Sequence, residues 1–220
     1  MFIFKVKNII SDLEYNILEK TFPNFNKEQL INKNDNKYSF NSKSETFSNL
    51  INKNNDLCNL YKNLKKKIVY LILKKLLFII FKERQFSIKL LLKFVLHFLK
   101  IKNFFYFSIE YSYILNKGFI VPHNDGGKKL ISLMLYISKK DNNYGTTFFL
   151  NDKKSEKNIH LKDQNEINYM KNNSTVIKLP FDNKYLYGFI RNDKSWHSVE
   201  SLDIAENYIR KSININYNIL

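Results

Sequence analysis

The sequence predicts an α+β protein in which a mainly helical first part is followed by a β-sandwich or jelly roll. All five glycines and two of the three prolines lie after residue 117, where tight turns between short strands would need them. Apolar residues recur every three or four positions in the first part and about every second position in the second. We therefore divide the chain into a mainly helical extension, residues 1–103, and a β domain, residues 104–220.

Helix signals mark three segments of the first part. Residues 11–14 read Ser-Asp-Leu-Glu, a capping box in which the first and last side chains each bond a backbone N–H. The helix that this box opens should end before Pro23. Apolar residues at three- and four-residue steps predict amphipathic helices over residues 47–82 and 86–99. Residues 24–46 are polar, and we expect them to be irregular.

Short strands should fill the second part. Gly, Asn and Asp turns separate them, which is typical of a sandwich or jelly roll. A polar insert, residues 151–173, should form a long excursion between two of them. The predicted strands span residues 104–109, 114–121, 130–137, 146–149, 174–179, 187–190, 196–199 and 210–217.

The formal net charge of +16 would fit an anionic partner such as nucleic acid or membrane lipid. The lysines are scattered over the whole length, however, and arginine occurs only at positions 84, 191 and 210. A general use of Lys in place of Arg explains the charge as well as a polyanion site does, so nucleic acid is not an expected partner. Lysines on the two long helices could bind a membrane surface, although such helices more often pack their apolar stripe on a core.

The sequence carries no mark of export or of membrane insertion. Cys58 is the only cysteine, which excludes an intrachain disulfide, and the first residues lack the continuous apolar run of a secretory signal. The most apolar stretch, residues 68–81, is interrupted by Lys74 and Lys75 and is shorter than the roughly 20 residues that a bilayer span needs. We expect a cytoplasmic protein without a transmembrane segment.

Three residues of the β domain have the types and spacing of a metal site. His123 and Asp125 stand two positions apart, so on a strand they point to the same face. His197 can join them from a strand brought alongside. Two imidazoles and one carboxylate on one triangular face leave half of the octahedral positions open, as in the non-haem Fe(II) oxygenases.

Arg210 and Ser212 form a second pair on one face of a predicted strand. A guanidinium donates two charge-assisted hydrogen bonds to a carboxylate, and a neighbouring hydroxyl adds a third. The pair therefore predicts a receptor for the carboxylate of a small organic acid.

Together these pieces give the second part a resemblance to a known family. From about residue 104 to 217 the chain resembles the Fe(II)- and 2-oxoglutarate-dependent oxygenase superfamily, and within it the prolyl 4-hydroxylase-like members. The matching segments, in order, are His123-Asn124-Asp125 and residues 132–137, 145–149, 195–199 and 210–212. Arg210 departs from the collagen-modifying relatives, which have Lys there, and Tyr144-Gly145 stands in place of a pair of glycines.

The resemblance implies a double-stranded β-helix and a dioxygenase that uses Fe(II), 2-oxoglutarate and O2, with ascorbate as an optional reductant. It implies that His123, Asp125 and His197 hold the iron. Arg210 would bind the distal carboxylate of 2-oxoglutarate, and Tyr136 matches a position from which some relatives add a hydroxyl. The reaction would hydroxylate a C–H bond of a peptidyl, amino-acid or other small substrate, and release succinate and CO2. Because Asp125 is present, hydroxylation or desaturation is favoured over halogenation.

Other interpretations of these residues stay open. His123 could belong to a turn and His197 to a core, in which case the domain would be a non-catalytic, cupin-like jelly-roll module with Arg210 in a structural salt bridge. The net charge also suggests a third hypothesis, a nucleic-acid demethylase on the same fold. This hypothesis predicts oligonucleotide binding with a steep salt dependence. His97 and His160 are expected to be packing or surface residues, not ligands.

Overall fold

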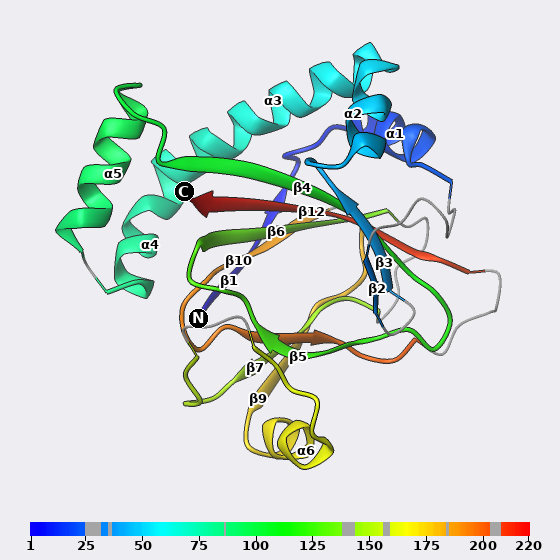
Figure 1. Ribbon diagram of the computed structural model, residues 1–220, viewed down its shortest axis with the longest axis vertical. Helices are drawn as coiled ribbons and strands as arrows, with labels where there is room; N and C mark the ends of the chain where they lie inside the picture. The colour runs from blue at the N-terminus through cyan, green and yellow to red at the C-terminus, as the bar shows by residue number, and fades with distance from the viewer. Residues whose placement is uncertain are drawn as a thin grey trace.

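Two antiparallel sheets form the body of the protein in this computed structural model, which describes residues 1–24, 32–34, 37–85, 87–137, 144–155, 159–183, 185–202 and 208–220 (Figure 1). In spatial order, the large sheet contains β1 (Phe2–Lys7), β10 (Tyr185–Ile190), β6 (Lys129–Ile137), β12 (Arg210–Ile219), β4 (Phe105–Ile114), β3 (Lys37–Asn41) and β2 (Asn32–Asn34). The small sheet contains β8 (Ile159–His160), β5 (Ile120–Asn124), β11 (Trp196–Val199), β7 (Thr147–Leu150) and β9 (Thr175–Lys178). The sheets form the predicted α+β jelly roll.

Helices cover the face of the large sheet that points away from the small sheet (Figure 1). They are α1 (Asp12–Thr21), α2 (Glu45–Asn52), α3 (Asn55–Leu71), the π-helical turn η2 (Ile72–Leu76), α4 (Leu77–Glu83) and α5 (Ile88–Phe98). One continuous apolar core joins these helices to the sheet, which confirms the predicted helical region packed on the roll. No helix in the described ranges is both long and apolar enough to cross a bilayer.

Local signals in the sequence explain where two of these helices begin. At α1 the predicted capping box is present, since Glu14 N–H donates to the Ser11 hydroxyl and Ser11 N–H donates to the Glu14 carboxylate. The helix predicted over residues 47–82 is interrupted at Asn54, whose side chain accepts from Leu57 N–H and caps α3. The single predicted helix is therefore a series of segments.

The first part of the chain also supplies strands, which the sequence pattern did not indicate. Strand β1 pairs with β10 at one edge of the large sheet, and β3 pairs with β4 near the other. The expectation that residues 24–46 are irregular is wrong for β2 and β3, and residues 25–31 and 35–36 of that range lie outside the described residues. In β3, Tyr38 and Phe40 alternate with polar residues and are buried in the core. The division at residue 103 stays a prediction about domain organisation.

Two further boundaries differ from the predicted ones. The strand predicted over residues 114–121 is instead the end of β4, a turn and the start of β5, because Gly118 N–H bonds the carbonyl of Leu115 and reverses the chain. The polar insert contains β8 and the helix α6 (Gln164–Asn172), which Asp163 caps through its carboxylate. Ile167 and Met170 fix that helix against the small sheet.

Strand β12 separates the apolar layer from a polar cavity between the two sheets. It lies in the middle of the large sheet, paired with β6 on one side and β4 on the other. Its side chains alternate, as they must on a strand. The helix side of β12 carries Ile213, Ile215 and Tyr217. The cavity side carries Arg210, Ser212, Asn214 and Asn216.

Candidate metal centre

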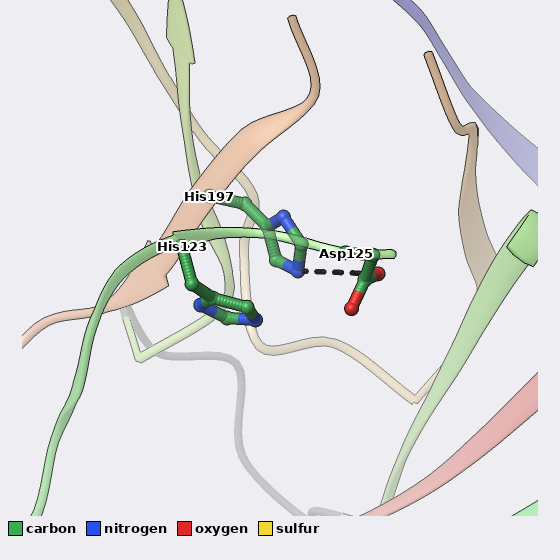
Figure 2. A group of neighbouring side chains, drawn as sticks. All are labelled: His123, Asp125 and His197. Carbon is green, nitrogen blue, oxygen red and sulfur yellow. Dashed lines mark ion pairs between the residues drawn. The ribbon is translucent and has the colours of Figure 1, made fainter. Parts of the chain in front are cut away.

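Two neighbouring strands of the small sheet bring the three predicted ligands together. Strands β5 and β11 pair antiparallel with His123 directly opposite His197, and Asp125 follows the end of β5. One ligand atom from each of the three residues lies within 4.8 Å of the other two. Figure 2 shows the two imidazoles and the carboxylate turned toward one region, with 3.8 Å between His197 Nε2 and Asp125 Oδ2.

Backbone carbonyls orient both imidazoles. Nδ1 of His123 lies 3.0 Å from the carbonyl oxygen of Val121, and Nδ1 of His197 lies 2.9 Å from that of Ser195. A carbonyl can only accept, so each Nδ1 carries the proton and each Nε2 keeps a lone pair. Burial lowers the pKa of both histidines, and for His123 the neighbouring His197 lowers it further. Both rings are therefore neutral, the form that binds a metal ion.

Asp125 is an ionised, buried carboxylate. Burial alone would raise its pKa, but the charge of the Lys129 ammonium, joined at low pH by those of the two imidazoles once they are protonated, outweighs burial and holds the pKa below its ordinary value. Lys129 Nζ lies 2.7 Å from Oδ1, and the Ser132 hydroxyl, which donates to Asn216, lies 3.4 Å from Oδ2. Arg191 Nε donates to the backbone carbonyl of Asp125 at 2.8 Å, which fixes the chain where β5 ends. The oxygen nearest His197 is thus Oδ2, while Oδ1 is engaged by Lys129.

The imidazoles have different neighbours on their two sides. His160 lies opposite His123 in the β5–β8 pair, and the two rings stack with 4.7 Å between centroids. His160 is exposed and packs on His123 without joining the group of three found among the described residues. Phe148 and Phe189 pack their rings against His197, at 5.9 and 4.8 Å. The side of His197 that faces Phe148 and Phe189 is therefore apolar, and the side of His123 that faces His160 is polar.

A cavity of about 220 Å³ lies between the sheets, and the three residues line it from the small sheet. Arg210 and Ser212 line it from the large sheet. Hydrogen-bonding and charged side chains make up much of the rest of its wall. They include Lys37, Glu110, Ser112, Lys129, Asn214 and Asn216.

Arg210 is a buried cation without an acidic partner among the described residues. Its Nε donates to the carbonyl of Tyr144 at 2.7 Å, and its guanidinium lies over the rings of Tyr136 and Phe181, at 5.2 and 4.9 Å. Burial lowers its pKa, and no carboxylate in the described part of the chain forms an ion pair with it. Since a buried charge is costly unless it is paired, this site favours an anionic ligand.

Tyr136 lies beside Arg210, and a side-chain hydrogen bond between the two partly offsets the lowering of the Arg210 pKa by burial. The hydroxyl accepts from Thr146 N–H at 3.1 Å and lies 3.0 Å from the Thr146 hydroxyl. Tyr136 thus supports the guanidinium with its ring, and its direct role in ligand binding stays a prediction.

Sequence reasoning did not find three residues of the site. Lys129, Arg191 and Thr146 hold Asp125 or Tyr136 in place. For Lys129 the spacing of four from Asp125 carried no signal, since the intervening residues form a turn, not a helix. The scarcity of arginine in this chain was the one signal that could have singled out Arg191.

Comparison with solved structures links this architecture to known folds. EctD from S. alaskensis, solved with 2-oxoglutarate and 5-hydroxyectoine, aligns with a TM-score of 0.53 and 11% identity over 98% of this chain and 71% of that one. The epimerase SnoN, solved with Fe3+, alpha ketoglutarate and nogalamycin RO, gives 0.52 and 10% over 98% and 78%. A Pseudomonas putida prolyl-4-hydroxylase gives 0.50 and 9% over 98% and 91%.

No family model matches the sequence, and no curated protein matches it. The likeness to the solved structures is therefore one of fold, and the sequence identities are too low for a sequence comparison to detect it. It extends over almost the whole of this chain and includes the helical first part. The chain has the jelly-roll fold of the iron- and 2-oxoglutarate-dependent oxygenases, as the resemblance in its sequence predicts.

Proposed function

We propose that this protein is an Fe(II)- and 2-oxoglutarate-dependent dioxygenase that hydroxylates a C–H bond of a polar organic or peptidyl substrate and releases succinate and CO2. One observation carries the proposal. Two imidazoles and a carboxylate converge on one side of a cavity that also contains a buried guanidinium, for which the described part of the chain offers no acidic partner. The fold of the solved neighbours agrees with it.

The donor set suits ferrous iron. Two neutral nitrogens and one carboxylate oxygen from one side of a cavity form a 2-His-1-carboxylate triad, which leaves positions open toward the cavity. His123, Asp125 and His197 would hold the ion. The backbone carbonyls behind the two imidazoles fix the ring orientation that such ligands need.

The opposite wall suits 2-oxoglutarate. Arg210 would bind the distal carboxylate through its guanidinium, and Ser212, on the same face of β12, would donate a hydrogen bond. The rings of Tyr136 and Phe181 hold the guanidinium in place, so little orientational freedom would be lost on binding. In relatives with a lysine here, one ammonium would take over this role without the planar fork.

Iron and 2-oxoglutarate, when bound, supply the activation of O2 and the oxidative decarboxylation that drives hydroxylation. The residues of the chain position and shield the reacting groups. Phe148 and Phe189 exclude water from the inner side of His197. Asp125 keeps Oδ2 toward His197 because Lys129 engages Oδ1. Because the carboxylate ligand is present, hydroxylation is favoured over halogenation.

A polar substrate fits the remaining wall. Lys37 and Glu110 form an ion pair at 3.2 Å, and Asn214 donates to the same carboxylate at 3.3 Å. Asn216 accepts from Ser132 at 2.9 Å. These groups offer hydrogen bonds of both kinds to a hydroxyl, amide or amino group, and an alkane-like substrate would leave them unsatisfied.

The ion pair between Lys129 and Asp125 favours one alternative, a non-catalytic jelly-roll module. At 2.7 Å the ammonium satisfies the carboxylate without any metal ion. In that case the cavity would bind an organic anion at Arg210 alone.

Turnover of the cosubstrate separates the two functions. Purified protein is incubated with ferrous iron, ascorbate and labelled 2-oxoglutarate, and succinate is measured. The dioxygenase forms succinate slowly even without its true substrate, and His197→Ala abolishes this. A protein that binds iron and 2-oxoglutarate but forms no succinate, even with pools of polar metabolites added, would support the module.

A further inference from the structure

Exposed apolar side chains lie along α4 and α5, the two helices at the left of Figure 1. Phe78 on α4 is 80% exposed, Ile88 on α5 is 75% exposed, and Leu99 at the end of α5 is 64% exposed. Single exposed apolar side chains are ordinary, but a cluster of large ones marks an interaction site. The ridge, as the name is used below, consists of Phe78, Ile88, Leu91, Leu92, Val95 and Leu99.

On α5 the ridge is a single face. Ile88, Leu91, Leu92 and Val95 stand at positions i, i+3, i+4 and i+7, and Leu99, at i+11, follows the end of the helix on the same side. The opposite side of α5 carries Leu90 and Phe94, which are buried in the core. The rings of Phe81 and Phe94 meet edge to face at 5.8 Å, which joins α4 to α5. Helix α5 thus has two apolar faces, and only one of them is covered.

Lysines surround this face. Between residues 62 and 102 the sequence contains Glu83 as its one acidic residue, against eleven lysines and Arg84. Glu83 itself is engaged by the N-terminal amine and by Asn192. Exposed lysines lie next to the ridge in sequence, on η2, α4 and α5 and just after the end of α5. They are Lys74, Lys75, Lys82, Lys89 and Lys100.

We propose that the ridge docks the protein on an anionic phospholipid membrane, with α5 lying in the plane of the headgroups. Apolar side chains would enter the boundary between headgroups and acyl chains, while the lysine stems let their ammonium groups reach the lipid phosphates. This inference does not depend on the proposed reaction.

Charge complementarity selects this occupant over a second copy of the chain. Two ridges face to face would bring two strongly basic segments together, within a protein of net charge +16. Nucleic acid would satisfy the lysines but would leave Phe78 and Ile88 in water. A surface that is anionic outside and apolar beneath satisfies both kinds of side chain.

Vesicle co-sedimentation of the full chain tests the proposal. The probes are phosphatidylcholine vesicles with and without phosphatidylserine, and the protein should pellet only with the anionic vesicles. Leu92→Ser combined with Leu99→Ser, and separately Lys89→Glu combined with Lys100→Glu, should each weaken binding about tenfold or more. All four side chains are exposed, so thermal melting should be unchanged.

Two matched controls lie outside the ridge. Leu13 on α1 is 71% exposed and Lys162 precedes α6, so Leu13→Ser and Lys162→Glu should leave vesicle binding unaltered. Failure to pellet with anionic vesicles would overturn the proposal, as would equal binding by the ridge variants. Two other results would also overturn it. One is an oligonucleotide that displaces the vesicles and whose binding depends on the lysines but not on Leu92 and Leu99. The other is a dimer in gel filtration that Leu92→Ser dissociates.

Discussion

The two faces of the large sheet differ in what their side chains do. On the helix side, β12 presents Ile213, Ile215 and Tyr217 to a continuous apolar core. On the cavity side, the same strand presents Arg210 and Ser212 to a polar space shared with the three predicted metal ligands. One strand thus separates the groups that stabilise the fold from those that would bind ligands. Substitutions on the two faces should therefore have separable consequences, since neighbours along the strand point opposite ways.

The largest expected effect is on the reaction itself. Asp125→Ala removes one of three ligands and should lower succinate formation on the order of a thousandfold. The fold should persist, since Asp125 contributes to the cavity wall and not to the apolar core. The rate of succinate release measures the loss of activity, and a circular dichroism melt shows whether the fold persists. Loss of the folded state would show that the centre is structural.

On the helix side, Ile213→Ala should act on stability. Ile213 is fully buried in the core, and its truncation should lower the free energy of unfolding by about 3 kcal/mol. Urea denaturation measures the change. The affinity for 2-oxoglutarate of the fraction that remains folded should be unaltered, and a selective loss of affinity would contradict the separation of the two faces.

On the cavity side, Arg210→Ala should mainly weaken the apparent affinity for 2-oxoglutarate, by about fiftyfold, because a charge-assisted pair of hydrogen bonds is lost. Titration of 2-oxoglutarate in the succinate assay measures this affinity. Arg210→Lys keeps the charge and loses the planar fork, so its affinity for 2-oxoglutarate should lie between those of the wild type and Arg210→Ala. An unchanged affinity in Arg210→Ala would remove this residue from its proposed role.

The smallest effect is expected at the neighbouring hydroxyl. Ser212→Ala should weaken 2-oxoglutarate affinity about fivefold, the worth of one hydrogen bond to a charged group in a partly hydrated site. Titration of 2-oxoglutarate in the succinate assay measures this affinity. Lys211→Ala is the matched control and should leave the affinity unchanged, since Lys211 points to the other side of β12. An equal loss in both variants would mean that the strand and not the hydroxyl is responsible.

The sequence predicted which side chains converge at the candidate site better than it predicted the residues around them. His123 and Asp125 follow from the alternation of a strand, and Arg210 stands out because arginine is scarce in this chain. The pairing of β5 with β11, which brings in His197, follows from the resemblance to a known fold and not from local pattern. The contacts of Lys129 and Arg191 depend on turn geometry and tertiary packing, so residue spacing alone could not give them.

The strands of the first part were harder to predict for a physical reason. Strand β3 has only two buried aromatics, Tyr38 and Phe40, within a long polar stretch. Strand β1 lies at an edge of the large sheet and is half-buried, so its pattern is not that of a core strand. Both are stabilised by pairing with strands that are distant in the sequence, and the pattern of a few neighbouring residues does not reveal such partners.

Binding of ferrous iron to the purified protein tests the central claim most directly. In anaerobic titration calorimetry we expect heat that saturates at one ion per chain in the wild-type protein. No such heat should remain in Asp125→Ala or His197→Ala, while His160→Ala, the stacked neighbour outside the triad, should bind one ion as the wild type does. No heat with the wild-type protein, or saturation unaltered by loss of Asp125, would contradict the assignment of these three residues to one metal centre.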